Sequence, residues 1–130
     1  MAHPKLVTAY AQYDFAVDGG AISTITLANS AEIPNNAIIV GCYTHVKTAC
    51  ATASGTATII IKAGGVALSP AVNHTDNEFD TADQVSNVMT LNNSSLGAKA
   101  TSDLGVQFTI ADAALNAGVV DVYVQYYQSY

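Results

Sequence analysis

Apolar side chains recur at every second position through most of this 130-residue chain, and turn-forming residues separate the alternating runs. Alternate side chains point to opposite faces of a β-strand, whereas a helix requires a period of 3.6 residues. About eight runs of this kind, spaced fairly regularly, are typical of an antiparallel β-sandwich or barrel. The sequence therefore predicts a single all-β domain, an antiparallel β-sandwich with a jelly-roll-like arrangement of its strands.

The stretch "IPNNAIIVGCYTHV" at positions 33–46 shows how a strand begins in this chain. Pro34 holds Ile33 in an extended conformation, and the two asparagines that follow suit a turn. The apolar run over 37–47 then predicts a strand that is buried on at least one side. Its predicted core face consists of Ile38, Val40, Cys42, Thr44 and Val46.

A glycine turn predicts how the first two strands pair. Asp18-Gly19-Gly20 separates a strand over 6–17 from a strand over 21–27. Glycine adopts a positive φ without steric cost, which suits the tight reversal of an antiparallel pair. We therefore expect these two strands to form a β-hairpin.

Charged residues are scarce and mostly acidic. Only 11% of the residues are charged, the net charge is −6, and the four basic residues are all lysine. No basic cluster could neutralise a row of phosphates, so we expect no direct binding of nucleic acid. No apolar run approaches the ~20 residues of a membrane helix, so we expect no membrane insertion. A surface with so little charge also predicts a partner that covers part of it.

The strongest candidate for a metal site is the acidic segment "HTDNEFD". In an extended segment its alternate residues share one face, and oxygen-rich clusters of this kind bind calcium. The segment lacks the glycine and the spacing of an EF-hand loop, however, so a solvated acidic loop is the preferred interpretation. The candidate ligands are His74, Asp76, Glu78 and Asp80.

The sequence contains no recognisable set of catalytic residues. It has no G-x-S-x-G nucleophile elbow and no glycine-rich phosphate loop, and neither glutamate lies in an apolar stretch. The spacing of Cys42 and Cys50 fits neither a zinc site nor a redox pair, so we expect free, buried thiols. We expect a protein that is not an enzyme and that needs no cofactor.

Tyrosines gather at the end of the chain, in the run "VVDVYVQYYQSY", which predicts a final strand. Alternation puts two of them on each face of that strand. One pair would pack in the core, and the other would contact a neighbouring subunit, since tyrosine is favoured at interfaces. The pattern leaves open which pair does which. The four residues are Tyr123, Tyr126, Tyr127 and Tyr130.

Three stretches resemble a family of small bacteriophage virion proteins of the head-fibre, decoration or structural type. They are "AQYDFAVDGGAISTITL", "IPNNAIIVGCYTHVKTAC" and "FTIADAALNAGVVDVYVQYY". The last of these has Gln125 where the family often has glutamate. The middle of the chain departs from the family, because it carries the acidic "HTDNEFDTAD" where family members tend to have a loop with tryptophan.

The resemblance implies a homotrimeric module that binds the major capsid protein on the outside of a phage capsid and is assembled in the host cytoplasm. Residues 1–9 would form an N-terminal arm, and residues 10–130 the sandwich domain. The alternative function is a receptor- or carbohydrate-binding module of a phage fibre, which would use the loop over 73–84. The arm passes from polar to apolar residues, so its predicted anchor to the capsid consists of His3, Pro4, Lys5 and Leu6.

Overall fold

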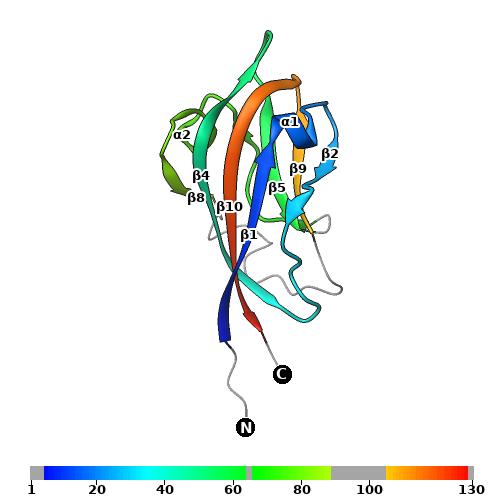
Figure 1. Ribbon diagram of the computed structural model, residues 1–130, viewed down its shortest axis with the longest axis vertical. Coiled ribbons are helices and arrows are strands. Elements are labelled where there is room, and N and C mark those ends of the chain that lie inside the picture. The colour runs from blue at the N-terminus through cyan, green and yellow to red at the C-terminus, as the bar shows by residue number, and fades with distance from the viewer. Residues whose placement is uncertain (1–4, 64–65, 89–104, 129–130) are drawn as a thin grey trace.

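The structure, a computed structural model, describes residues 5–63, 66–88 and 105–128. Its strands form two antiparallel sheets that pack face to face (Figure 1). The first, which we call the long sheet, has the order β3 (Asn29–Ser30), β1 (Lys5–Asp14), β10 (Leu115–Gln128), β4 (Ile38–Thr52), β8 (Val85–Asn87). The second, the short sheet, has the order β2 (Thr24–Thr26), β9 (Val106–Ala111), β5 (Thr58–Ala63), β6 (Val66–Ala67), with β7 (Val72–Asn73) also paired to β5.

The pairing of the strands is nested, which confirms the predicted sandwich. β1 pairs with β10, β2 with β9, β4 with β8, and β5 with β6 and β7, so the early strands pair with the late ones. The pair β1–β10 and the pair β2–β9 form one two-stranded ribbon that bends from the long sheet to the short sheet. Nine residues separate Asp14 from Thr24, and nine separate Thr109 from Val119, so both pairs of strands have the same register. An antiparallel ribbon that wraps in this way is the strand order of a jelly roll.

The predicted hairpin between the first two strands is wrong. β1 ends at Asp14, whose side chain accepts a hydrogen bond from the backbone N–H of Ala16 and begins the one-turn helix α1 (Phe15–Asp18). Gly20 then packs against the first residue of β10 and has no room for a side chain, because a Cβ at this position would lie 2.2 Å from the carbonyl oxygen of Leu115. The glycines therefore carry the chain across to the short sheet instead of reversing it.

A β-bulge in β4 changes the predicted core face of that strand. Cys42, Thr44 and Val46 are fully buried, as predicted. The register shifts where β4 faces Gln125 and Tyr126 of β10, so β4 has one extra residue there. Ile39 consequently faces the core and Ile38 is 38% exposed, which reverses the prediction for Ile38 and Val40.

The core lies between the two sheets and contains the alternate residues of the central strands. Val106, Phe108 and Ile110 of β9 are buried, which confirms the alternation seen in the sequence. The rings of Phe108 and Tyr13 stack with centroids 4.8 Å apart. The final strand is also confirmed, since β10 lies between β1 and β4 at the centre of the long sheet (Figure 1).

Both cysteines are free and buried. Burial raises the pKa of Cys42 to about 12, and burial together with the charge of Asp80 raises the pKa of Cys50 to about 12. Very little thiolate therefore exists at neutral pH, and the thiolate is the reactive form of cysteine. Two inert core thiols agree with the expectation from the sequence.

Candidate interaction face

The acidic segment holds its candidate metal ligands apart. Asn77–Asp80 is a single helical turn, α2, and Phe79 within it is fully buried. His74 is also buried, and its Nδ1 accepts a hydrogen bond of 3.0 Å from the backbone N–H of Ala57. Asp76 and Asp80 are exposed, and Glu78 is half-buried. Within the described residues, no group of three or more His, Cys, Asp or Glu side chains could hold a metal ion.

Side chains on the solvent side of the long sheet form a different candidate site, which we call the outer face. The strands of this sheet alternate, so every second residue contributes to it. Its members are Leu6, Thr8, Tyr10 and Gln12 of β1; Ile38, Gly41, Tyr43, His45 and Lys47 of β4; Val85 and Asn87 of β8; and Asp121, Tyr123, Gln125 and Tyr127 of β10.

Three tyrosines form a row across the middle of the outer face. Tyr10, Tyr123 and Tyr43 occupy directly opposite positions on β1, β10 and β4. The rings of Tyr10 and Tyr123 lie 5.5 Å apart at an interplanar angle of 54°. Pairs of aromatic side chains opposite one another stabilise a sheet, and they also leave a broad aromatic surface toward solvent.

A second row of large side chains lies near the end of the long strands. Leu6, Tyr127 and Ile38 are directly opposite one another, at the end of the molecule where β1 begins and β10 finishes (Figure 1). They are 53%, 41% and 38% exposed. Among the described residues, seven large hydrophobic side chains are exposed, and five of them belong to the outer face: Leu6, Tyr10, Ile38, Val85 and Tyr127.

A row without large hydrophobic side chains lies between these two rows. It consists of Thr8, Gln125 and Gly41, which are opposite one another on the three strands. A Cβ at Gly41 would lie 3.1 Å from the Gln125 Oε1 atom and 3.3 Å from the Tyr43 ring, so these two side chains lie over the glycine. The outer face therefore has two rows of large side chains with a polar row between them, in which Gln125 and Tyr43 fill the space over Gly41.

Asp121 is a nearly buried carboxylate within this face, only 2% exposed. Its Oδ1 accepts hydrogen bonds from the Tyr10 hydroxyl at 2.6 Å and from the Gln12 amide at 2.9 Å. Lys47 Nζ lies 3.5 Å from the other oxygen. Burial raises the pKa of Asp121, but these donors and the lysine charge outweigh it and hold the pKa below its ordinary value.

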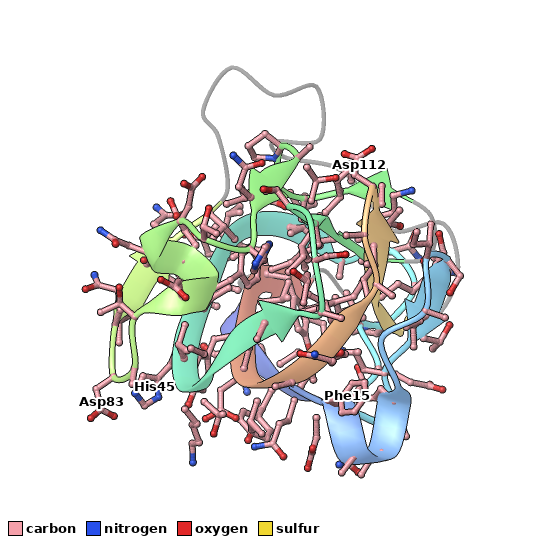
Figure 2. The ribbon with its side chains drawn as sticks, turned by 90° about the horizontal axis from the view of Figure 1, so that it is seen from above. Phe15, His45, Asp83 and Asp112 are labelled. Atoms are coloured by element: carbon pink, nitrogen blue, oxygen red, sulfur yellow. The ribbon has the colours of Figure 1, made fainter. Side chains whose placement is uncertain are left out.

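The Asp121 carboxylate raises the pKa of Tyr10 and lies close to His45. The hydrogen bond to the carboxylate, together with burial, raises the pKa of Tyr10 to about 12. His45 lies between two carboxylates, with Nδ1 3.8 Å from Asp121 and Nε2 3.7 Å from Asp83. Figure 2 shows the side chains of His45 and Asp83 next to one another. The site is thus a polar network on an exposed sheet, in which the buried Asp121 carboxylate has both hydrogen-bond donors and a lysine as partners.

The tyrosines at the end of the chain divide between core and outer face. Tyr126 is 7% exposed and belongs to the core, together with Val122 and Val124. Tyr123 and Tyr127 lie on the outer face, and Tyr130 lies outside the described residues. The sequence prediction missed Tyr10 and Tyr43, because only the pairing of distant strands brings them beside Tyr123. It missed Asp121 because the partners of this carboxylate come from two other strands.

Only part of the predicted anchor lies within the described residues. His3 and Pro4 lie outside them. Lys5 and Leu6 are the first residues of β1, opposite Gln128 and Tyr127. Residues 5–9 of the predicted arm are therefore paired with β10 and belong to the sandwich.

Comparisons with known proteins establish the fold. No family model matches the chain, and no curated protein matches it. It is similar to a chain in the structure "Cyanophage Pam1 capsid asymmetric unit", with a TM-score of 0.64 and 19% identity over 97% of this chain and 86% of that chain. It is also similar to a chain in "Acidic stable capsid structure of Helicobacter pylori bacteriophage KHP30", with a TM-score of 0.62 and 15% identity over 98% and 90% of the two chains. Across the described part of the chain, no helix is long and apolar enough to cross a membrane.

The Asp121 network predicts a specific sensitivity to acid. The folded-state pKa lies below the ordinary value of 3.8, so the ionised carboxylate stabilises the fold above that pH. This contribution is lost as the pH falls from about 4 through the lower folded-state pKa. We expect Asp121→Asn to lower the free energy of unfolding at pH 7 by on the order of 1–3 kcal/mol, the strength of hydrogen bonds to a charged group.

Urea unfolding at pH 7, 5 and 3 measures this effect. The gap between the wild type and Asp121→Asn should narrow toward pH 3, since below pH 3.8 this carboxylate takes up a proton more readily in the unfolded chain than in the folded one. Asp83→Asn is the matched control, because its side chain is 95% exposed and its replacement should change stability by less than about 0.5 kcal/mol. A gap for Asp121→Asn that stays constant with pH would show that the network does not depend on the carboxylate charge.

Proposed function

We propose that this chain is a structural protein of a bacteriophage virion that decorates the outside of the capsid and has no enzymatic role. The observation that carries the proposal is the extent of the structural likeness. Chains from two phage capsid structures share the fold over 97% and 98% of this chain. A fold alone does not determine a function, so the proposal also needs support from the sequence. That support is the absence of a recognisable catalytic set and the resemblance of three stretches to virion proteins.

The mechanism of such a protein is mechanical. Many weak contacts between its subunits and the major capsid protein would hold neighbouring capsid subunits together. The titratable groups of the outer face suit this role better than catalysis, because a tyrosine with a pKa of about 12 is a poor acid or base at neutral pH. A homotrimer bound to the major capsid protein, as the sequence resemblance implies, is the assembly that we propose.

The proposed anchor to the capsid is the beginning of the chain, with His3 and Pro4. Residues 5–9 pair with β10, so their removal would take away half of β1 and would not test an anchor. Deleting residues 1–4 alone leaves β1 whole. We expect this variant to assemble as the wild type does and to lose binding to capsids that lack the protein. Normal decoration by the variant would assign the docking surface to the sandwich.

The copy number in purified particles tests the function itself. Quantitative mass spectrometry would compare this chain with the major capsid protein in particles from the source culture. We expect a fixed ratio close to that of an abundant coat component. Absence from the particles would overturn the virion role. Only a few copies per particle would overturn decoration, and would favour a component of a vertex or of the tail, such as a receptor-binding fibre.

A further inference from the structure

The outer face is built so that it can be covered without leaving a charge unpaired. Its buried carboxylate, Asp121, has all its close partners within the same chain. Lys47 lies beside it, so the two formal charges offset one another. Among the described residues, no buried side-chain nitrogen or oxygen lacks a hydrogen-bond partner. An incoming apolar surface would therefore not have to satisfy the Asp121 carboxylate, whereas the Lys47 ammonium, whose side chain is 52% exposed, would still need water or an acceptor at the edge of the contact.

The solvent side of the whole long sheet reaches roughly the lower limit of the area that a stable protein contact needs. Its three long strands have 10, 14 and 15 residues. At about 3.3 Å per residue and ~4.8 Å between strands, they present roughly 600 Å², and the short strands β3 and β8 add to it. A standard interface buries about 800 Å² on each partner. Aromatic residues at its centre are the type that dominates binding energy at interfaces.

We infer that the outer face packs against another copy of this chain. The inference rests on the homotrimer proposed above and names the face that forms it. Copies with a net charge of −6 repel one another, so they can meet only where charge is cancelled. The outer face meets this condition, and it holds five of the seven exposed large hydrophobic side chains of the described residues. The four lysines of the chain leave no basic patch for a nucleic acid or an acidic lipid surface.

The order of the rows also suits a copy of the chain as partner. The tyrosine row and the row of Leu6, Tyr127 and Ile38 lie on either side of the polar row of Thr8, Gln125 and Gly41. Two copies that meet through this face place large aromatic and aliphatic side chains in contact on both sides of that polar row. Closed assemblies of identical subunits are the common result when a surface complements the same chain.

A charge placed on the outer face tests the inference. Tyr127→Asp puts a carboxylate in the row of Leu6, Tyr127 and Ile38. Ile22→Asp is the matched control, since Ile22 is 59% exposed and lies between α1 and β2, away from the outer face. Light scattering at several protein concentrations gives the mass, and thermal unfolding followed by circular dichroism shows that each variant folds. We expect the wild type and Ile22→Asp to have a mass that is a multiple of 13.4 kDa. Tyr127→Asp should dissociate into monomers at protein concentrations at least tenfold higher than those at which the wild type dissociates.

Thiol labelling gives a second measurement of the same contact, which remains valid if a substitution slightly lowers the stability of the fold. The native thiols are buried with pKa values of about 12, so an introduced cysteine is the reactive one. The labelling rate of Tyr127→Cys should fall as protein concentration rises, whereas that of Ile22→Cys should not change. A wild type that stays at 13.4 kDa, or an oligomer in which Tyr127→Cys remains freely labelled, would overturn the inference.

The two proposals fail in different experiments. A chain that is abundant in particles, but monomeric with an open outer face, would refute the self-contact and leave the virion role standing. A chain that is absent from particles, but assembles through this face, would do the reverse.

Discussion

Removing residues 119–130 is expected to leave a chain that is insoluble or unfolded. The deletion takes away most of β10, which pairs with β1 on one side and with β4 on the other. Val120, Val122 and Val124 are fully buried, and each is worth roughly 1.5–3 kcal/mol of burial. Their sum alone rivals the whole stability of a domain, about 5–15 kcal/mol. The loss of β10 also leaves β1 and β4 as unpaired edges, which promote aggregation.

Solubility, circular dichroism and urea unfolding of the truncated chain measure this result. Tyr127→Ala is the control on the same strand, because its side chain is 41% exposed and its loss should cost no more than about 1 kcal/mol. A soluble truncated chain with a single cooperative unfolding transition would show that β10 is an addition to the sandwich and not its centre.

Phe79→Ala is expected to lower the free energy of unfolding by about 3–5 kcal/mol, the usual cost of deleting a buried phenylalanine. Phe79 is fully buried although its neighbours in α2 are polar. Its ring lies 6.1 Å from that of Phe108, at an interplanar angle of 78°. The Thr44 hydroxyl also donates a hydrogen bond to the carbonyl oxygen of Glu78, so the helical turn is fixed to β4 beside the ring.

Urea unfolding of Phe79→Ala and of Asp80→Ala separates the two kinds of residue in this turn. Asp80 is exposed, so its replacement should change stability by less than about 0.5 kcal/mol. Equal effects of the two variants would contradict the placement of Phe79 in the core. If only Phe79→Ala is destabilised, the acidic segment that contains α2 is packed on the sandwich through Phe79 and is not a free loop.

The alternation of the sequence by itself determined the class of the fold and much of the core. Val106, Phe108 and Ile110 are buried as the period of two predicts, and the final strand extends over 115–128. These predictions succeed because the direction of a side chain in a strand depends only on its position along that strand. The low charge and the tyrosines of the last strand also predict a covered surface, and that stays a prediction.

Only the tertiary structure decided which strands pair and in which register. Residues 21–27 follow a glycine turn, yet β2 joins β9, more than 80 residues later in the chain. The bulge at Val40 exchanges the faces of Ile38 and Ile39, which the local pattern does not reveal. Contacts between segments so far apart in sequence are selected by burial and by loop geometry, not by local preference.

The outer face is a product of the same long-range pairing. Tyr10 and Tyr123 are more than 100 residues apart, and the register of β1 with β10 places their rings 5.5 Å from each other. Asp121 looked like one polar position in an apolar strand, and it becomes a buried carboxylate because Tyr10, Gln12 and Lys47 from two other strands surround it. Its burial depends on donors that the fold brings together, since a carboxylate without them would cost too much free energy to leave water.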